Sequence, residues 1–108
     1  MKTHRVTILP SAERDIGGAY EWLAEQDADA AIRWYNRLLE VIFSLDNFPD
    51  RCPIAPESKF LSADIREIFH GRRQHKYRIL FTVSGDNVYV LHVRHGARLA
   101  LGETESDD

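Results

Sequence analysis

Residues 90–98, VLHVRHGAR, end an apolar run with a cluster of ionisable side chains. Arg94, His95 and Arg98 lie within five consecutive positions of this stretch. An imidazole changes its charge near neutral pH, so His95 has the chemistry of a general acid or base. Guanidinium groups bind phosphate and carboxylate through paired N–H donors. The stretch therefore predicts either proton transfer on an anionic substrate or the binding of an anionic surface.

Basic side chains are concentrated in one segment of a chain whose formal net charge is −3. Residues 64–98 contain seven basic and three acidic residues, whereas the segments on both sides are acidic. An uneven distribution of this kind is typical of proteins with an anionic partner. A solvated sheet face would produce the same distribution, so both interpretations stay open at this point.

Composition argues against several other classes of protein. The chain has one cysteine, Cys52, which excludes an internal disulfide and fits a reducing compartment. No apolar run approaches the ~18 residues of a membrane-spanning helix, and the N-terminus lacks a signal-peptide pattern. The histidines do not have the spacing of a metal site. We therefore expect a cytoplasmic protein that binds neither a membrane nor a metal and needs no cofactor.

The first half of the chain predicts a strand followed by two helices. Residues 5–9 alternate and are rich in β-branched side chains, and Pro10 ends this strand. Ser11 is the expected cap of a helix over about residues 12–26. A second helix follows over about residues 29–46, and the short link between the two implies an antiparallel hairpin. Gly17 and Gly18, inside the first helix, are interpreted as a place where another element approaches closely, with a break in the helix as the alternative.

The second half predicts a loop and three strands. Residues 47–62 contain three prolines and form a loop, and residues 65–69, 77–83 and 88–94 form strands, the last two joined by a hairpin turn. The expected fold is α+β, with a helical hairpin on one face of a small three- to four-stranded, mainly antiparallel sheet. The alternation places Lys76 and Arg78 on the other, open face, and Arg66 is expected to join them.

One domain is expected over residues 1–98, because a chain of 108 residues is long enough for one core. Residues 99–108 lose the apolar pattern and carry four acidic side chains, so we expect a mobile tail.

Over about residues 5–98 the chain resembles the toxins of bacterial type II toxin–antitoxin modules, the RelE/ParE superfamily. The similarity lies in the order of SAERDIGGAYEWLAEQ, DADAAIRWYNRLLEVIFSLDNFP and DIREIFHGRRQHKYRILFTVSGDNVYVLHVRHGAR. Within the last segment, Tyr-Arg-Ile-Leu-Phe and a closing His-Gly-x-Arg match the family pattern. The resemblance implies the same fold, a cognate antitoxin that neutralises the toxin, and a toxin–antitoxin hetero-oligomer.

The superfamily has two main activities, and both stay open. RelE-like members are ribosome-dependent nucleases that cut mRNA without a metal. That activity would use Arg66, Lys76, Arg78 and Arg98 as cations and His95 as the acid or base. ParE-like members inhibit DNA gyrase and perform no chemistry of their own.

Three features favour the ParE-like branch. The sequence pI is about 5.9, whereas a protein that docks on ribosomal RNA is typically basic. No tyrosine follows the last strand, and the helical hairpin is long. We therefore expect a gyrase inhibitor, with the nuclease as the alternative and a weakly toxic or inactive antitoxin-binding module as the second alternative.

The expected contact residues divide into two sets. The target would be bound by the basic side chains and one histidine of the C-terminal half: Arg66, Arg72, Arg73, Lys76, Arg78, Arg94, His95 and Arg98. The antitoxin would bury apolar surface that includes Trp34 and Leu80.

Overall fold

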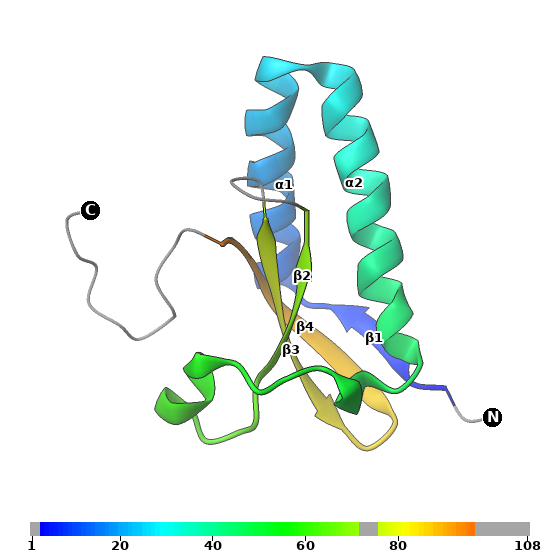
Figure 1. Cartoon of the computed structure of the whole chain (residues 1–108), viewed down its shortest axis with the longest axis vertical. Helices are drawn as coiled ribbons and strands as arrows, with labels where there is room; N and C mark the ends of the chain where they lie inside the picture. The colour runs from blue at the N-terminus through cyan, green and yellow to red at the C-terminus, as the bar shows by residue number, and fades with distance from the viewer. Residues whose placement is uncertain (1–2, 72–75, 97–108) are drawn as a thin grey trace.

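The computed structural model describes residues 3–71 and 76–96, and the expected tail lies outside this part of the chain. A helical hairpin packs on one face of a four-stranded sheet (Figure 1). The elements follow the order β1 (Arg5–Ile8), α1 (Pro10–Gln26), α2 (Ala28–Phe43), β2 (Arg66–His70), β3 (Tyr77–Ser84) and β4 (Asn87–His95). The predicted α+β fold, including its order of elements, is confirmed.

The strands lie side by side in the order β1-β4-β3-β2. The three C-terminal strands pair with one another in antiparallel fashion, and β1 pairs with β4 in parallel. Strands β3 and β4 are joined by a two-residue turn in which Gly85 has a φ of +58°. Glycine takes this left-handed conformation without the steric cost that other residues have, which fixes the hairpin at this position.

A β-bulge in β4 changes which side chains face the helices. Phe81 pairs with Val90 and Leu80 pairs with His92, so Leu91 is an extra residue in β4. The bulge shifts the alternation by one position. Val90 and Val93 therefore both lie in the core under the helices, although they are three residues apart.

The two helices begin differently from one another. The N-cap of α1 is Leu9, which has no capping side chain, and Pro10 occupies the first helical position. The expectation that Ser11 caps this helix is therefore wrong, and its hydroxyl instead donates to the carbonyl of Leu91 over 2.6 Å. Helix α2 is capped by Asp27, whose carboxylate accepts from the N–H of Ala30 over 3.1 Å.

The core lies between the hairpin and the sheet. Small and branched residues of both helices, among them Ala12, Ile16, Leu38 and Ile42, pack against β3 and β4. The glycines of α1 do not contribute to this packing. An added Cβ at Gly17 or at Gly18 would meet no atom within 4 Å, so the expected close approach of another element there is wrong.

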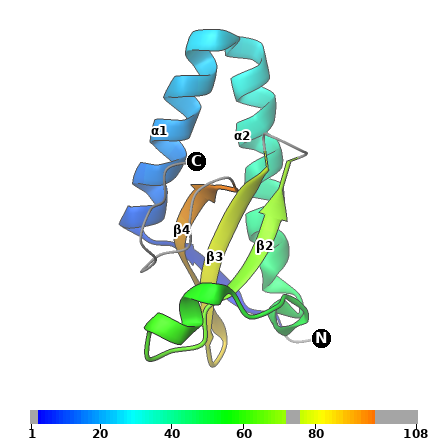
Figure 2. The same ribbon diagram turned by 60° about the vertical axis from the view of Figure 1, so that its left-hand side comes forward.

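The proline-rich segment between α2 and β2 covers part of the other sheet face. It contains three short 3₁₀ turns, Ser44–Asp46, Pro49–Arg51 and Pro56–Phe60, and crosses the strands near one end (Figure 2). Ala55 from this segment packs with Ile65 and Leu80 in a second, smaller core cluster. The face opposite the helices is therefore only partly open.

Candidate functional site

Arg78 is held between two carboxylates on the face opposite the helices. Its Nη2 lies 2.7 Å from Glu57 Oε1, and its Nε donates to Glu67 Oε1 over 3.0 Å. Only 8% of the Arg78 side chain and 1% of the Glu57 side chain are exposed. Burial acts to lower the pKa of Arg78, but the hydrogen bonds and charges of the two acids outweigh it and raise that pKa. The expectation that Arg78 lies on an open face is therefore wrong, because Glu57 and Glu67 already neutralise it.

Leu80 and Trp34 offer less apolar surface than expected. Leu80 is 1% exposed because Ala55 and Ile65 pack over it, so it cannot give a partner any surface in this conformation. Trp34 is half-buried against the core, with its ring 5.1 Å from that of Tyr77. Its Nε1 is buried and has no hydrogen-bond partner within the described residues. Both side chains stabilise the fold, and the expected exposure of Leu80 is wrong.

Arg66 connects the proline-rich segment to the sheet. It pairs with Phe81 across β2 and β3 and therefore shares the helix-facing side of the sheet. Its Nη1 donates to the carbonyl of Cys52 over 2.6 Å and to that of Asp50 over 3.2 Å. The expectation that Arg66 joins an open basic face is therefore wrong.

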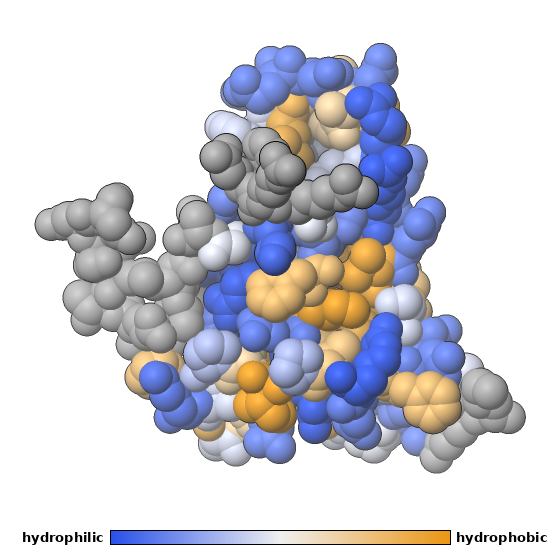
Figure 3. All heavy atoms as spheres, in the orientation of Figure 1, coloured by the Kyte–Doolittle hydropathy of each residue, from blue (hydrophilic) through white to orange (hydrophobic). Residues whose placement is uncertain are grey.

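Lys76 and Arg94 lie on the same face as Arg78, the face opposite the helices. Lys76 is exposed, and its Nζ lies 5.2 Å from the ring centre of Phe69. Figure 3 shows apolar side chains gathered near the centre of this side of the molecule, bordered by hydrophilic residues. Arg94 pairs with Arg78 across β3 and β4, and its Nε is buried without a partner within the described residues. The other predicted cations, Arg72, Arg73 and Arg98, lie outside these residues.

His95 lies on the opposite side of the sheet from Arg78. It pairs with Tyr77, which belongs to the core under the helices, and the two rings meet edge to face at 5.2 Å. The partners of His95 and Arg66 on β3 are Tyr77 and Phe81, four positions apart. At ~3.3 Å per residue this places their backbones at least about 13 Å from each other. Among the described residues proposed for nuclease chemistry, Arg66 and His95 are therefore not brought together around one scissile bond, and Arg78 lies on the other side of the sheet from both.

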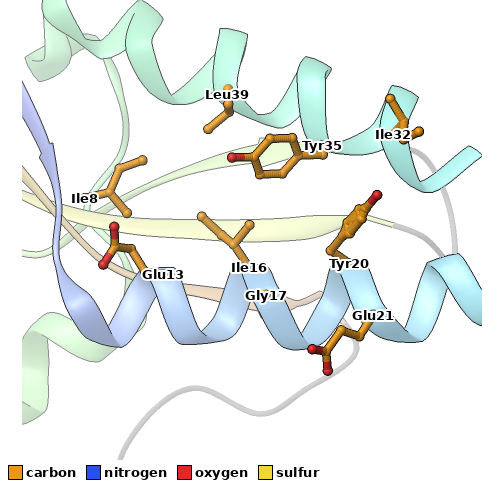
Figure 4. A pocket seen from close by; sticks show the side chains of 9 residues that line it. All are labelled: Ile8, Glu13, Ile16, Gly17, Tyr20, Glu21, Ile32, Tyr35 and Leu39. Carbon is orange, nitrogen blue, oxygen red and sulfur yellow. The ribbon is translucent and has the colours of Figure 1, made fainter. Parts of the chain in front are cut away.

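A groove between the two helices was not anticipated from the sequence. It has a volume of about 570 Å³ and is lined by Ile8, Glu13, Ile16, Gly17, Tyr20, Glu21, Ile32, Tyr35 and Leu39. Figure 4 shows the apolar side chains of both helices around the gap, with Tyr20 and Tyr35 near one end. Ile32 is 47% and Tyr35 is 38% exposed, so this groove is an accessible apolar surface. The helical periodicity predicts that the apolar residues of this set face the core. Whether they border an accessible groove depends on the distance between the two helices, which the sequence does not show.

Three other features of the described residues concern metal ligands, membrane-spanning helices and the thiol of Cys52. No group of three or more metal-ligating side chains lies together in residues 3–71 and 76–96. Within the same part of the chain, no helix is long and apolar enough to cross a membrane. Burial raises the pKa of the Cys52 thiol, against a smaller opposing effect of Arg51 and Arg66.

The chain is similar to known proteins of type II toxin–antitoxin systems. A family model described as "ParE toxin of type II toxin-antitoxin system, parDE" matches residues 6–100. A structure of the chromosomal ParDE toxin–antitoxin system from P. aeruginosa has a TM-score of 0.69 at 14% identity, covering 86% of this chain and 96% of that chain. A structure of the toxin–antitoxin complex RelBE2 from Mycobacterium tuberculosis has a TM-score of 0.49 at 20% identity, covering 91% and 97% of the two chains. No curated protein matches the sequence.

Proposed function

Because the chain belongs to the ParE toxin family of type II toxin–antitoxin systems, we propose that it arrests growth by binding DNA gyrase and performs no chemistry of its own. A cognate antitoxin neutralises it in a toxin–antitoxin complex, and both processes take place in the cytoplasm. The resemblance of the sequence to ParE-like toxins supports gyrase as the target, and the geometry supports the absence of catalysis.

The burial of Arg78 between Glu57 and Glu67 carries this proposal. Cleavage of RNA without a metal needs cations at the scissile phosphate and a nearby proton donor. The Nε and Nη2 groups of Arg78 already donate to two carboxylates, so they are engaged and not free to hold a scissile phosphate. His95 also lies on the other side of the sheet. A ribosome-dependent nuclease, the alternative, would require Arg78 and His95 to move from these positions.

The target-binding residues that remain accessible are Lys76, Arg94 and His95, with Arg72, Arg73 and Arg98 as candidates outside the described residues. Arg66 and Arg78, which the sequence suggested for the same role, act through the fold by holding the proline-rich segment against the sheet. We therefore propose that the accessible residues contact the target, and that Arg66 and Arg78 keep them in position.

The groove between the helices is the surface that we propose for the antitoxin, in place of Leu80. Ile32 and Tyr35 are exposed there and have no covering element in the described part of the chain. Glu13 and Glu21 also line the groove. A helix with an apolar face and basic flanks is complementary to such a groove, because the apolar face is buried while the flanking cations meet the acids. Trp34 could contribute only at the edge of this interface.

Pulse labelling in bacteria tests the proposed target. The chain is induced alone, and the incorporation of thymidine and methionine is followed over the first minutes. An early stop in DNA synthesis, while translation continues, is expected of a gyrase inhibitor. An early stop in translation would favour the nuclease instead, and incorporation of both labels at the normal rate would favour the inactive antitoxin-binding module.

A further inference from the structure

A second groove lies between α1 and the C-terminal end of β4. It has a volume of about 390 Å³. From α1 it is lined by Arg14, Gly18 and Trp22, which follow one another at the four-residue spacing of one helix face. From the sheet it is lined by Tyr77, Arg94 and His95. The groove thus combines an arginine from each side with an aromatic ring from each side.

The groove exists because β1 is shorter than β4. Strand β1 ends at Ile8, opposite Val90, so β4 has no strand beside it on the α1 side from Leu91 onward in the described part of the chain. Side chains of α1 occupy the first part of this edge. Ser11 donates to the carbonyl of Leu91 over 2.6 Å, and Asp15 accepts from the N–H of Val93 over 3.0 Å. Beyond Asp15 the helix presents Gly18, where an added Cβ would meet no atom within 4 Å.

The walls of the groove are basic and aromatic. Arg14 is exposed, and the Nε of Arg94 is buried without a hydrogen-bond partner within the described residues. A buried guanidinium N–H without a partner is costly, but Arg94 leaves the sheet on the face opposite the helices, so Arg14 is the arginine that meets a ligand from the α1 side. Trp22 has 54% of its surface exposed, which is unusual for so large an apolar side chain. Asp15 is the acid among the described residues that line the groove, and it is already engaged by the ring of His92, at 2.9 Å, and by the N–H of Val93.

We propose that this groove binds an extended, acidic peptide segment of the target protein. A carboxylate of that segment is held by Arg14, and an apolar side chain beside it packs on Trp22. An extended peptide can also lie along the edge of β4 and form main-chain hydrogen bonds with it. This proposal rests on the proposed function only for the identity of the protein that carries the segment.

A peptide fits the groove better than a nucleic acid does. The arginines are few and the chain is acidic overall, with a formal net charge of −3. The uniform charge of a polyphosphate backbone is repelled by such a chain and attracted only locally. A peptide places a carboxylate at Arg14 and keeps the remaining contact apolar, which suits the exposed ring of Trp22.

Fluorescence anisotropy of short peptides measures this binding directly on the full chain. The probe is a capped peptide of alternating glutamate and leucine that carries an uncharged dye, and its partner has glutamine in place of each glutamate. We expect saturable binding of the glutamate peptide and at least about tenfold weaker binding of the glutamine peptide, since about 1.4 kcal/mol corresponds to that factor. Arg14→Gln and Trp22→Ala should each weaken the glutamate peptide by a similar factor. Arg33→Gln, an exposed arginine on α2, is the matched control and should change nothing.

Several results would overturn the proposal. One is equal binding of both peptides. Another is that a thymidine oligonucleotide binds as tightly as the glutamate peptide and loses as much affinity in Arg14→Gln. A third concerns the four acids at positions 103, 105, 107 and 108. If their replacement by amides tightens peptide binding more than about tenfold, the occupant of the groove is the chain's own acidic tail.

A gyrase supercoiling assay with the same variants separates this proposal from the function. If the wild type inhibits gyrase and Arg14→Gln inhibits it equally well, the groove is not the target site, although the proposed function stands. If the wild type binds the glutamate peptide but does not inhibit gyrase, the groove and its ligand class stand and the proposed target is wrong.

Discussion

At the scale of single residues, the same side-chain type has different roles at neighbouring positions. Arg78 is buried between two acids, whereas Arg94, its partner on the adjacent strand, has an Nε without any acceptor in the described structure. The sequence shows both as arginines on strands. What distinguishes them is Glu57, which is 21 residues away in the chain from Arg78 and reaches it only through the path of the proline-rich segment. Contacts of this kind cannot be predicted from local periodicity.

Replacing Arg78 with alanine should destabilise the fold by about 3–5 kcal/mol, because it removes a buried cation from the buried Glu57 and the partly buried Glu67. Urea unfolding followed by circular dichroism measures this change. Lys76→Ala, at an exposed position two residues earlier, is the control and should change the free energy of unfolding by less than about 0.5 kcal/mol. Equal effects of the two substitutions would show that the buried ion pair does not hold this face together. A loss of toxicity in Arg78→Ala would therefore report unfolding and not a lost contact with the target.

Because of His70, the fold should become less stable in mild acid. Its pKa is lowered mainly by burial and also by the charge of Arg37, against a hydrogen bond to the backbone of Trp34 that raises it. The unfolded chain takes up this proton first, near the ordinary value of 6.5, so stability should fall as the pH drops through and below that value. His70→Gln should reduce the difference in melting temperature between about pH 7.5 and about pH 5.5. An unchanged difference would mean that other groups cause the acid sensitivity.

At the scale of the elements, the order and type of helices and strands could be predicted, and their fine geometry could not. Periodicity gave the hairpin and the three C-terminal strands, because each has an apolar face that follows its own repeat. The extra residue at Leu91 left no signal, since a bulge changes the phase of the alternation without changing composition. The sequence does carry a signal for the second groove, because Arg14, Gly18 and Trp22 share one face of α1, with a glycine between two large side chains.

Two glycines should respond in opposite ways to substitution by alanine. At Gly96 an added Cβ would lie 2.8 Å from the carbonyl oxygen of Lys76, so Gly96→Ala should destabilise the end of the β3–β4 hairpin. At Gly18 the space is open and the residue is helical, so Gly18→Ala should stabilise the fold by about 1 kcal/mol. Thermal unfolding of both variants provides the measurement.

The same Gly18→Ala variant partly fills the second groove, so it should also bind the glutamate peptide more weakly than the wild type. A gain in stability without a loss of peptide binding would show that Gly18 is not retained for the groove.

At the scale of the whole molecule, one fold presents two grooves of different character. The groove between the helices is apolar and has Glu13 and Glu21 among its lining residues, and the groove beside β4 is aromatic with two arginines. The two lie on different sides of α1, because Gly17 lines the first and Gly18 lines the second. An antitoxin in the first groove and an acidic target segment in the second would therefore meet the same helix. The family and the fold could be predicted from the sequence, whereas this division of surfaces depends on how far α1 stands from α2 and from β4.

The supercoiling activity of purified DNA gyrase in the presence of the purified chain tests the central claim most directly. The chain should inhibit supercoiling, and Arg94→Gln should reduce this inhibition by at least about tenfold while Arg33→Gln leaves it unchanged. The same preparation should leave mRNA on programmed ribosomes intact. Unchanged supercoiling together with cleavage of ribosome-bound mRNA would contradict the account and identify the chain as a nuclease that rearranges Arg78 and His95 on the ribosome.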